Sequence, residues 1–89
     1  MVFNFLKSIE RSHMIKEKVL EILCNMKEDV DFEQEAALID GKILDSLELM
    51  ELISELEDTF DIEIGMDEII PENFNSVAAI CALVEKLQG

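Results

Sequence analysis

The sequence predicts an all-α protein, a four-helix bundle with three longer helices and one short third helix. The chain has 89 residues, enough for one domain with a modest core, and 49% of them are hydrophobic. It contains only three glycines and one proline, too few for the many tight turns of a sandwich or barrel. Its abundant Leu, Ile, Glu, Lys and Met residues favour helix instead.

Residues 1–13 fit the helical pattern poorly, and the main domain is predicted to span 14–89. Residues 12–14, Ser-His-Met, resemble the remnant that an expression tag leaves before a start codon, so 1–13 is read as a tag remnant or flexible extension. The alternative is a native amphipathic extension that binds a membrane or a neighbouring chain. Its apolar side would consist of Phe3, Phe5, Leu6 and Ile9. The only histidine, His13, lies in this segment, so histidine-dependent catalysis is not expected.

The first bundle helix is predicted from Met14 to about Met26. Cys24 lies beside its apolar face and is predicted to be a small packing residue, because no basic group is fixed nearby to activate a thiol. Two cysteines within helical patterns, without a secretory signal, favour the cytoplasm. The inward face of this helix is predicted to consist of Ile15, Val19, Ile22, Leu23 and Met26.

A long connection, 27–44, opens with alternating acidic residues from Asp29, as a calcium loop does. Gln34 stands where an EF-hand needs its sixth-position glycine, and Asp40 stands in place of the twelfth-position glutamate. A solvated acidic loop is therefore expected.

Apolar residues within this connection are expected to order it. Phe32, Leu38 and Ile39 are predicted to fold back onto the bundle, since a loop of this length needs apolar anchors. Gly41 is expected to provide a permissive turn before the next helix.

The second long helix is predicted from Ser46 to about Phe60. Asp45 can cap it, and Glu48 can return a hydrogen bond to the Asp45 backbone, as in a capping box. Ser46 then lies at the helix mouth, where unpaired N–H groups and the macrodipole suit a phosphate esterified to its hydroxyl. The simpler interpretation is that Asp-Ser only starts a helix.

This second helix has more apolar residues than one buried stripe requires. Leu47 and Met50 fall on another face beside Glu51, where they form a docking strip or merely widen the core stripe. The core face is predicted to consist of Leu49, Leu52, Ile53, Leu56 and Phe60.

The formal net charge is -14, and no lysine or arginine occurs between Lys42 and Lys86. Such a charge repels nucleic acid and anionic membranes, and it makes basic protein surfaces the natural partners. No apolar run is long enough to span a bilayer, so membrane insertion is not expected.

The segment after the second helix is predicted to turn and form a short helix over 67–70, which Pro71 halts. Residues 71–76 are predicted to be a loop in which Phe74 either packs or protrudes toward a partner. Asn75 or Ser76 can cap the last helix. The core is expected to be closed by Ile62, Ile64, Ile69 and Ile70.

The final helix is predicted from Val77 to Leu87. Cys81 lies near its inward face and is expected to fill space in the core. The inward residues are predicted to be Val77, Ile80, Val84 and Leu87.

Residues 38–52, Leu-Ile-Asp-Gly-Lys-Ile-Leu-Asp-Ser-Leu-Glu-Leu-Met-Glu-Leu, resemble the attachment region of the acyl carrier protein superfamily. The resemblance extends from about Met14 to Leu87, and its signature is the Asp-Ser-Leu triplet at 45–47. It implies that Ser46 carries 4′-phosphopantetheine derived from coenzyme A, beside Asp45 and Leu47. It further implies that the arm's thiol holds an acyl or aminoacyl group as a thioester. The partner-facing residues would be Leu47, Met50, Glu51, Glu55 and Phe74.

The sequence has no histidine near a nucleophile, no phosphate-binding glycine loop and no cysteine pair at metal spacing, so an enzyme or a metal site is not expected. The carrier is expected to be a monomer. A phosphopantetheinyl transferase would attach the arm, a loading ligase would charge it, and downstream transferases with basic docking surfaces would use the cargo. Three segments, 41–46, 60–64 and 72–76, resemble D-alanyl or aminoacyl carriers more than fatty-acid carriers. Two rival functions are an unmodified acidic adaptor and a calcium-responsive helical protein.

Overall fold

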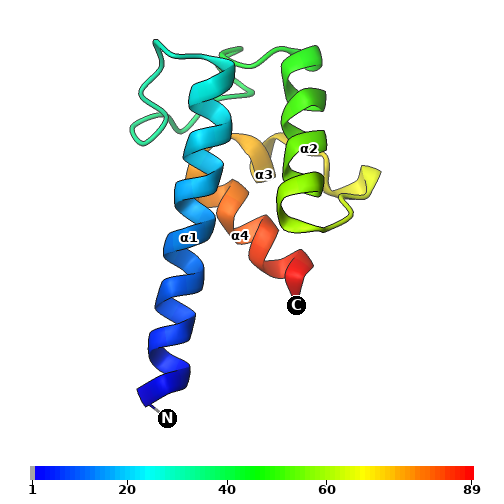
Figure 1. Cartoon of the computed structure of the whole chain (residues 1–89). Helices are drawn as coiled ribbons and strands as arrows, with labels where there is room; N and C mark the ends of the chain where they lie inside the picture. Colours follow the sequence, from blue (N-terminus) through cyan, green and yellow to red (C-terminus); the bar gives the residue numbers. More distant parts are fainter. Residues whose placement is uncertain (1) are drawn as a thin grey trace.

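The computed structural model describes the backbone of residues 2–89 and the side chains of residues 13–89. This part of the chain contains helices and no strand, which confirms the predicted all-α class (Figure 1). No helix in it is both long and apolar enough to cross a membrane. The elements in chain order are α1 (Val2–Met26), α2 (Ser46–Phe60), the 3₁₀ helix η1 (Met66–Glu68), α3 (Pro71–Phe74) and α4 (Val77–Gln88).

The bundle forms around α1, which packs against both α2 and α4, while the short α3 packs against α4. Figure 1 shows α1 and α2 side by side and running in opposite directions, with α4 crossing at an angle to both. Three residues of the predicted core face of α2 are buried, and Leu49 and Phe60 are partly buried against the core. The buried three are Leu52, Ile53 and Leu56. The fully buried residues of the three long helices include Val19, Leu23, Leu52, Leu56, Ile80 and Val84.

Helix α1 begins at Val2 rather than at the predicted Met14, and it ends at Met26 as predicted. The predicted amphipathic side of 1–13 lies outside the described side chains, and the assignment of that segment as a tag remnant or extension stays a prediction. Within the described part of α1, Ile15, Val19 and Leu23 are buried. The packing role predicted for Cys24 is wrong because its side chain is exposed.

The connection between α1 and α2 is held by its own apolar residues, as predicted. Phe32, Leu38 and Leu44 are buried, and Ile39 packs partly buried against the same core. These anchors order a segment without regular helix, because burying each side chain removes apolar surface from water and so holds the segment against the bundle. They also fix the chain immediately before Ser46.

Asn75 ties this connection to the junction between α3 and α4. Its side-chain oxygen accepts hydrogen bonds from the backbone N–H groups of Ile39 and Asp40, both at 3.0 Å. Its amide nitrogen donates to the Asp40 carboxylate at 3.0 Å, and its backbone carbonyl accepts from the Leu38 N–H at 2.9 Å. Of the two predicted caps of the last helix, the adjacent Ser76 is the N-cap, since its Oγ accepts from the Ala79 N–H at 3.1 Å.

The turn before α2 differs from its prediction. Gly41 has no left-handed backbone; it is required because an added Cβ would lie 2.6 Å from the Ala37 carbonyl oxygen. The next residue, Lys42, has the positive φ of 60° instead. A non-glycine residue in this conformation carries a steric cost, since its Cβ approaches the following carbonyl.

The region around the third helix differs from its prediction, since residues 71–74 are helical rather than a loop. Pro71 does not end a helix but is the first residue of α3, where its missing N–H costs nothing and its fixed φ suits a helix. Ile70 does not close the core, because 41% of its surface is exposed. Leu83 belongs to the buried face of α4, although the predicted inward set omitted it.

We expect Asn75→Asp to lower the free energy of unfolding by about 1–2 kcal/mol, because the new carboxylate would face Asp40 where an amide now donates. Urea unfolding of the single and double variants tests this. Asp40→Asn in the same chain should restore most of the loss, since the amide and carboxylate then exchange places. A double variant no more stable than Asn75→Asp would contradict the assigned contact.

Candidate functional site

The candidate site is the start of α2, and its geometry is that of a complete capping box, as predicted. Asp45 has an extended backbone, and its Oδ1 accepts from the Glu48 N–H at 2.8 Å. Glu48 Oε1 accepts in return from the Asp45 N–H at 3.1 Å. The two bonds satisfy N–H groups that a helix start leaves unpaired, and they set the angle at which the chain enters α2.

Glu48 also links this helix start to the end of α1. Its Oε2 lies 3.2 Å from Lys27 Nζ, and both side chains are partly shielded from solvent. One carboxylate therefore holds both the Asp45 backbone and a lysine of the preceding segment. Among the described residues, Lys27 is the lysine whose amine forms an ion pair with the acidic start of α2.

Ser46 is the first residue of α2 and is exposed. Within the described residues, no hydrogen bond to protein occupies its hydroxyl. It borders a cavity of about 310 Å³ that is lined by Ile39, Lys42, Leu44, Asp45, Ser46 and Leu49. An accessible hydroxyl beside open space fits a residue that is esterified by a bulky group.

The neighbouring face of α2 is open to solvent. Leu47 is 76% exposed and Met50 is 54% exposed, so the alternative that they widen the core stripe is wrong. Glu51 and Glu55 are also exposed. Two adjacent exposed apolar side chains with carboxylates beside them make a surface of the kind that binds another protein.

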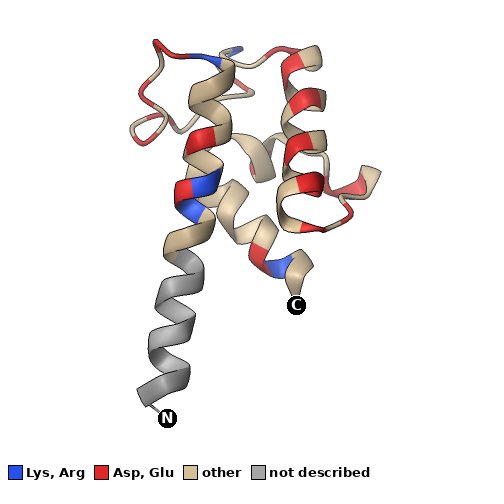
Figure 2. Ribbon diagram, in the orientation of Figure 1, with Lys and Arg blue, Asp and Glu red and all other residues tan. Residues whose placement is uncertain are grey.

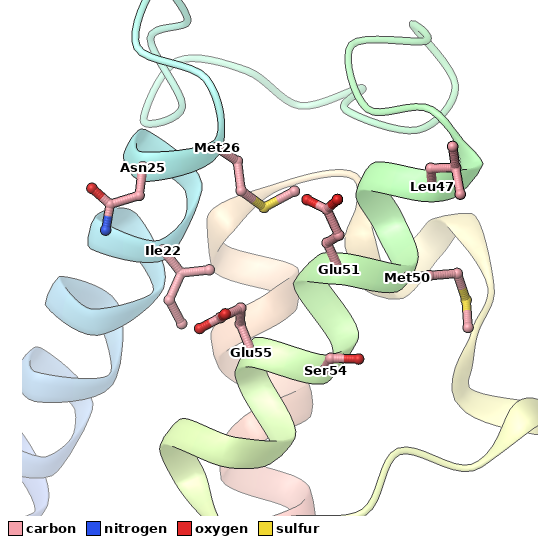
Figure 3. Close-up of a pocket in the computed structure, with 8 residues that line it drawn as sticks. All are labelled: Ile22, Asn25, Met26, Leu47, Met50, Glu51, Ser54 and Glu55. Carbon is pink, nitrogen blue, oxygen red and sulfur yellow. The ribbon is translucent and has the colours of Figure 1, made fainter.

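A groove of about 670 Å³ is lined by residues from the end of α1 and from the first part of α2. Figure 3 shows Glu51 and Glu55 on the side of α2 toward Met26, whereas Leu47 and Met50 project from its other side. The groove is lined by Ile22, Asn25, Met26, Leu47, Met50, Glu51, Ser54 and Glu55.

Phe74 is not part of the exposed surface. Its ring is fully buried, which confirms the first of the two predicted alternatives, packing into the core. Phe74 is therefore no longer counted among the residues that could face a partner. Its burial is the natural result of α3 packing against α4.

The charge distribution follows the sequence pattern. Figure 2 shows acidic residues along α2 and in the segment after it, with basic residues outside these elements. Exposed carboxylates on one helix repel each other, which favours the approach of a positively charged surface.

Neither cysteine belongs to the site. Cys81 is half-buried against the core, in agreement with its predicted packing role, and burial raises the pKa of its thiol, with the nearby Glu85 adding to the effect and Lys16 opposing it. At neutral pH this thiol therefore stays protonated and weakly nucleophilic.

The chain is similar to proteins of a known family. Residues 15–84 match the protein family described as "Phosphopantetheine attachment site". The chain is 40% identical over 75 residues to a D-alanyl carrier protein of Streptococcus pyogenes serotype M5 (strain Manfredo), with 83% of this chain and 95% of the relative covered. The same identity and coverage hold for the D-alanyl carrier proteins of serotype M49 (strain NZ131) and serotype M1.

We expect Asp45→Ala to destabilise the protein by about 1 kcal/mol, because the N–H of Glu48 loses its acceptor. Asp45→Asn keeps a capping oxygen and should cost much less, so it is the matched control. Urea unfolding of both variants measures the difference. Equal stability of the two variants would mean that the cap does not hold the start of α2.

Proposed function

The chain belongs to the phosphopantetheine-attachment family of acyl carrier proteins, and we propose that Ser46 holds the arm and that D-alanine is its cargo. The attachment of the arm to Ser46 is supported by the exposed hydroxyl of this residue at the capped start of α2. This residue lies within the part of the chain that matches the family. The cargo is supported by relatives named D-alanyl carrier proteins at 40% identity.

In the proposed attachment, the Ser46 oxygen attacks the phosphorus that joins pantetheine to the nucleotide of coenzyme A. The phosphorus–oxygen bond to the nucleotide breaks, and the hydroxyl proton passes to a base. We assign that base to a separate, magnesium-using phosphopantetheinyl transferase, because the Asp45 carboxylate next to Ser46 is engaged in capping α2. The chain supplies the acceptor and its position, and it is not an enzyme in its own right.

The attached arm supplies a thiol that holds an aminoacyl group as a thioester. The physical benefit is a high effective concentration, since tethered cargo meets each docked active site without escaping into solution. A loading ligase would form the thioester, and a downstream transferase would remove the cargo. We place these steps in the cytoplasm, because Cys24 and Cys81 are both free thiols.

The proposed docking strip consists of Leu47, Met50, Glu51 and Glu55. The two apolar side chains would supply contact area, and the two carboxylates would orient a basic partner surface. The strip begins one residue after Ser46, so a bound partner would lie close to the attachment point. We propose that the carrier presents this strip as a monomer.

We expect the intact mass to increase by one phosphopantetheine after incubation with coenzyme A and a broad-specificity phosphopantetheinyl transferase. Ser46→Ala should abolish the gain, because no acceptor oxygen remains at this position. Ser54→Ala, which removes another exposed hydroxyl of α2, should load normally. The absence of any gain with several transferases would refute a carrier and leave an unmodified acidic adaptor.

We expect Met50→Ala and Glu51→Gln to lower kcat/KM for transfer onto Ser46 several-fold, with little change in the free energy of unfolding, because both side chains are exposed. The loss in Glu51→Gln should shrink at high salt. Asp29→Asn, an equal charge change in the α1–α2 connection, is the control. An equal loss in that control would show that net charge alone matters.

A further inference from the structure

The cavity beside Ser46 combines apolar walls with one cation. Leu44 is buried, and Ile39 and Leu49 are partly buried, so the walls are fixed by the core rather than by solvent-exposed side chains. Lys42 is the only positively charged residue among those that line the cavity, and Asp45 is the only negatively charged one.

Lys42 lines this cavity with an exposed side chain, and its backbone is fixed. Its backbone N–H donates to the Ile39 carbonyl at 3.0 Å, and its φ of 60° fixes the turn. Among residues 13–89 no carboxylate lies within ion-pair distance of its amine, although three other lysines are paired. Those pairs are Lys16 with Glu33, Lys27 with Glu48, and Lys86 with Glu68.

An arm on Ser46 would add a negative phosphodiester to a chain that already has a net charge of -14. Asp45 adjoins the attachment point directly. Its Oδ1 is engaged in capping α2, and the Asp40 carboxylate is engaged with Asn75, but both remain negative. A lysine at the cavity would offset the repulsion that these charges exert on the phosphodiester.

We propose that Lys42 and this cavity hold the near end of the arm. The Lys42 amine pairs with the phosphodiester on Ser46, and the wall formed by Ile39, Leu44 and Leu49 accepts the branched apolar group that follows the phosphate in pantetheine. Lys42 is thus a positioning residue, and the far end of the arm with its thiol stays free to reach a partner. The proposal rests on the proposed function, in which Ser46 carries the arm.

The test compares the apo and loaded forms of the wild-type protein, Lys42→Gln, Lys42→Gly and Lys42→Arg. Intact mass first confirms that each variant carries the arm. Two-dimensional ¹H–¹⁵N and methyl NMR spectra then report changes at Ile39, Leu44 and Leu49, and thermal unfolding at low salt reports the shift in Tm on loading. Lys18→Gln, an exposed lysine of α1 away from the cavity, is the matched charge control.

In the wild type, loading should shift the signals of the cavity residues and raise Tm by about 2–4 °C, as a surface charge pair in a small domain would. Lys42→Arg and Lys18→Gln should keep both effects. In Lys42→Gln, the signal shifts and the rise in Tm on loading should both fall to half of the wild-type values or less. Lys42→Gly should raise the Tm of the apo form, because glycine adopts the positive φ without strain, and yet lose the effect of loading.

Two results would overturn the proposal while leaving the proposed function intact. One is a loaded wild type whose cavity signals and Tm do not change. The other is a Lys42→Gln variant that responds to loading as strongly as the wild type, which would mean that the start of α2 holds the phosphate alone. A wild type that gains no mass would refute the proposed function itself, and this proposal with it.

Discussion

The position of Ser46 depends on how a connection without regular helix is held against the bundle. Phe32 and Leu38 bury their side chains in the core, and Asn75 accepts hydrogen bonds from two consecutive backbone N–H groups of the connection. Backbone at the surface of a small domain is otherwise free to move, and a mobile entry would leave the start of α2 undefined. Contacts made far along the chain therefore determine where the Ser46 hydroxyl lies.

The same region reconciles strong acidity with a stable helix. Acidic residues near the start of a helix interact favourably with its dipole, and Glu48 uses both oxygens, one for the Asp45 backbone and one for Lys27. Farther along α2 the carboxylates have no such compensation from the dipole, and the same helix exposes Leu47 and Met50. This combination stabilises the isolated domain less than a polar face would, and it suits a surface that is covered in turn by different partners.

Local patterns in the sequence predicted α2 with its correct bounds, the capping box and the place of Ser46 at the helix start, because a cap depends on residues only three positions apart. The contacts of Asn75 with Ile39 span 36 residues, so no local pattern could reveal them. The burial of Phe74 and the exposure of Ile70 depend on how a one-turn helix packs, and a lone apolar residue in a short segment fits either outcome. The positive φ of Lys42 was not predicted, because glycine is the residue that usually takes this conformation and Gly41 stands next to it.

The most direct test of the carrier account is the mass of the protein isolated from cells that encode it, followed by fragmentation to locate any attached group. The account predicts one phosphopantetheine on Ser46, with a fraction of the arms bearing alanine that mild hydroxylamine removes, as expected of a thioester. An unmodified chain, or an arm on a different serine, would contradict it.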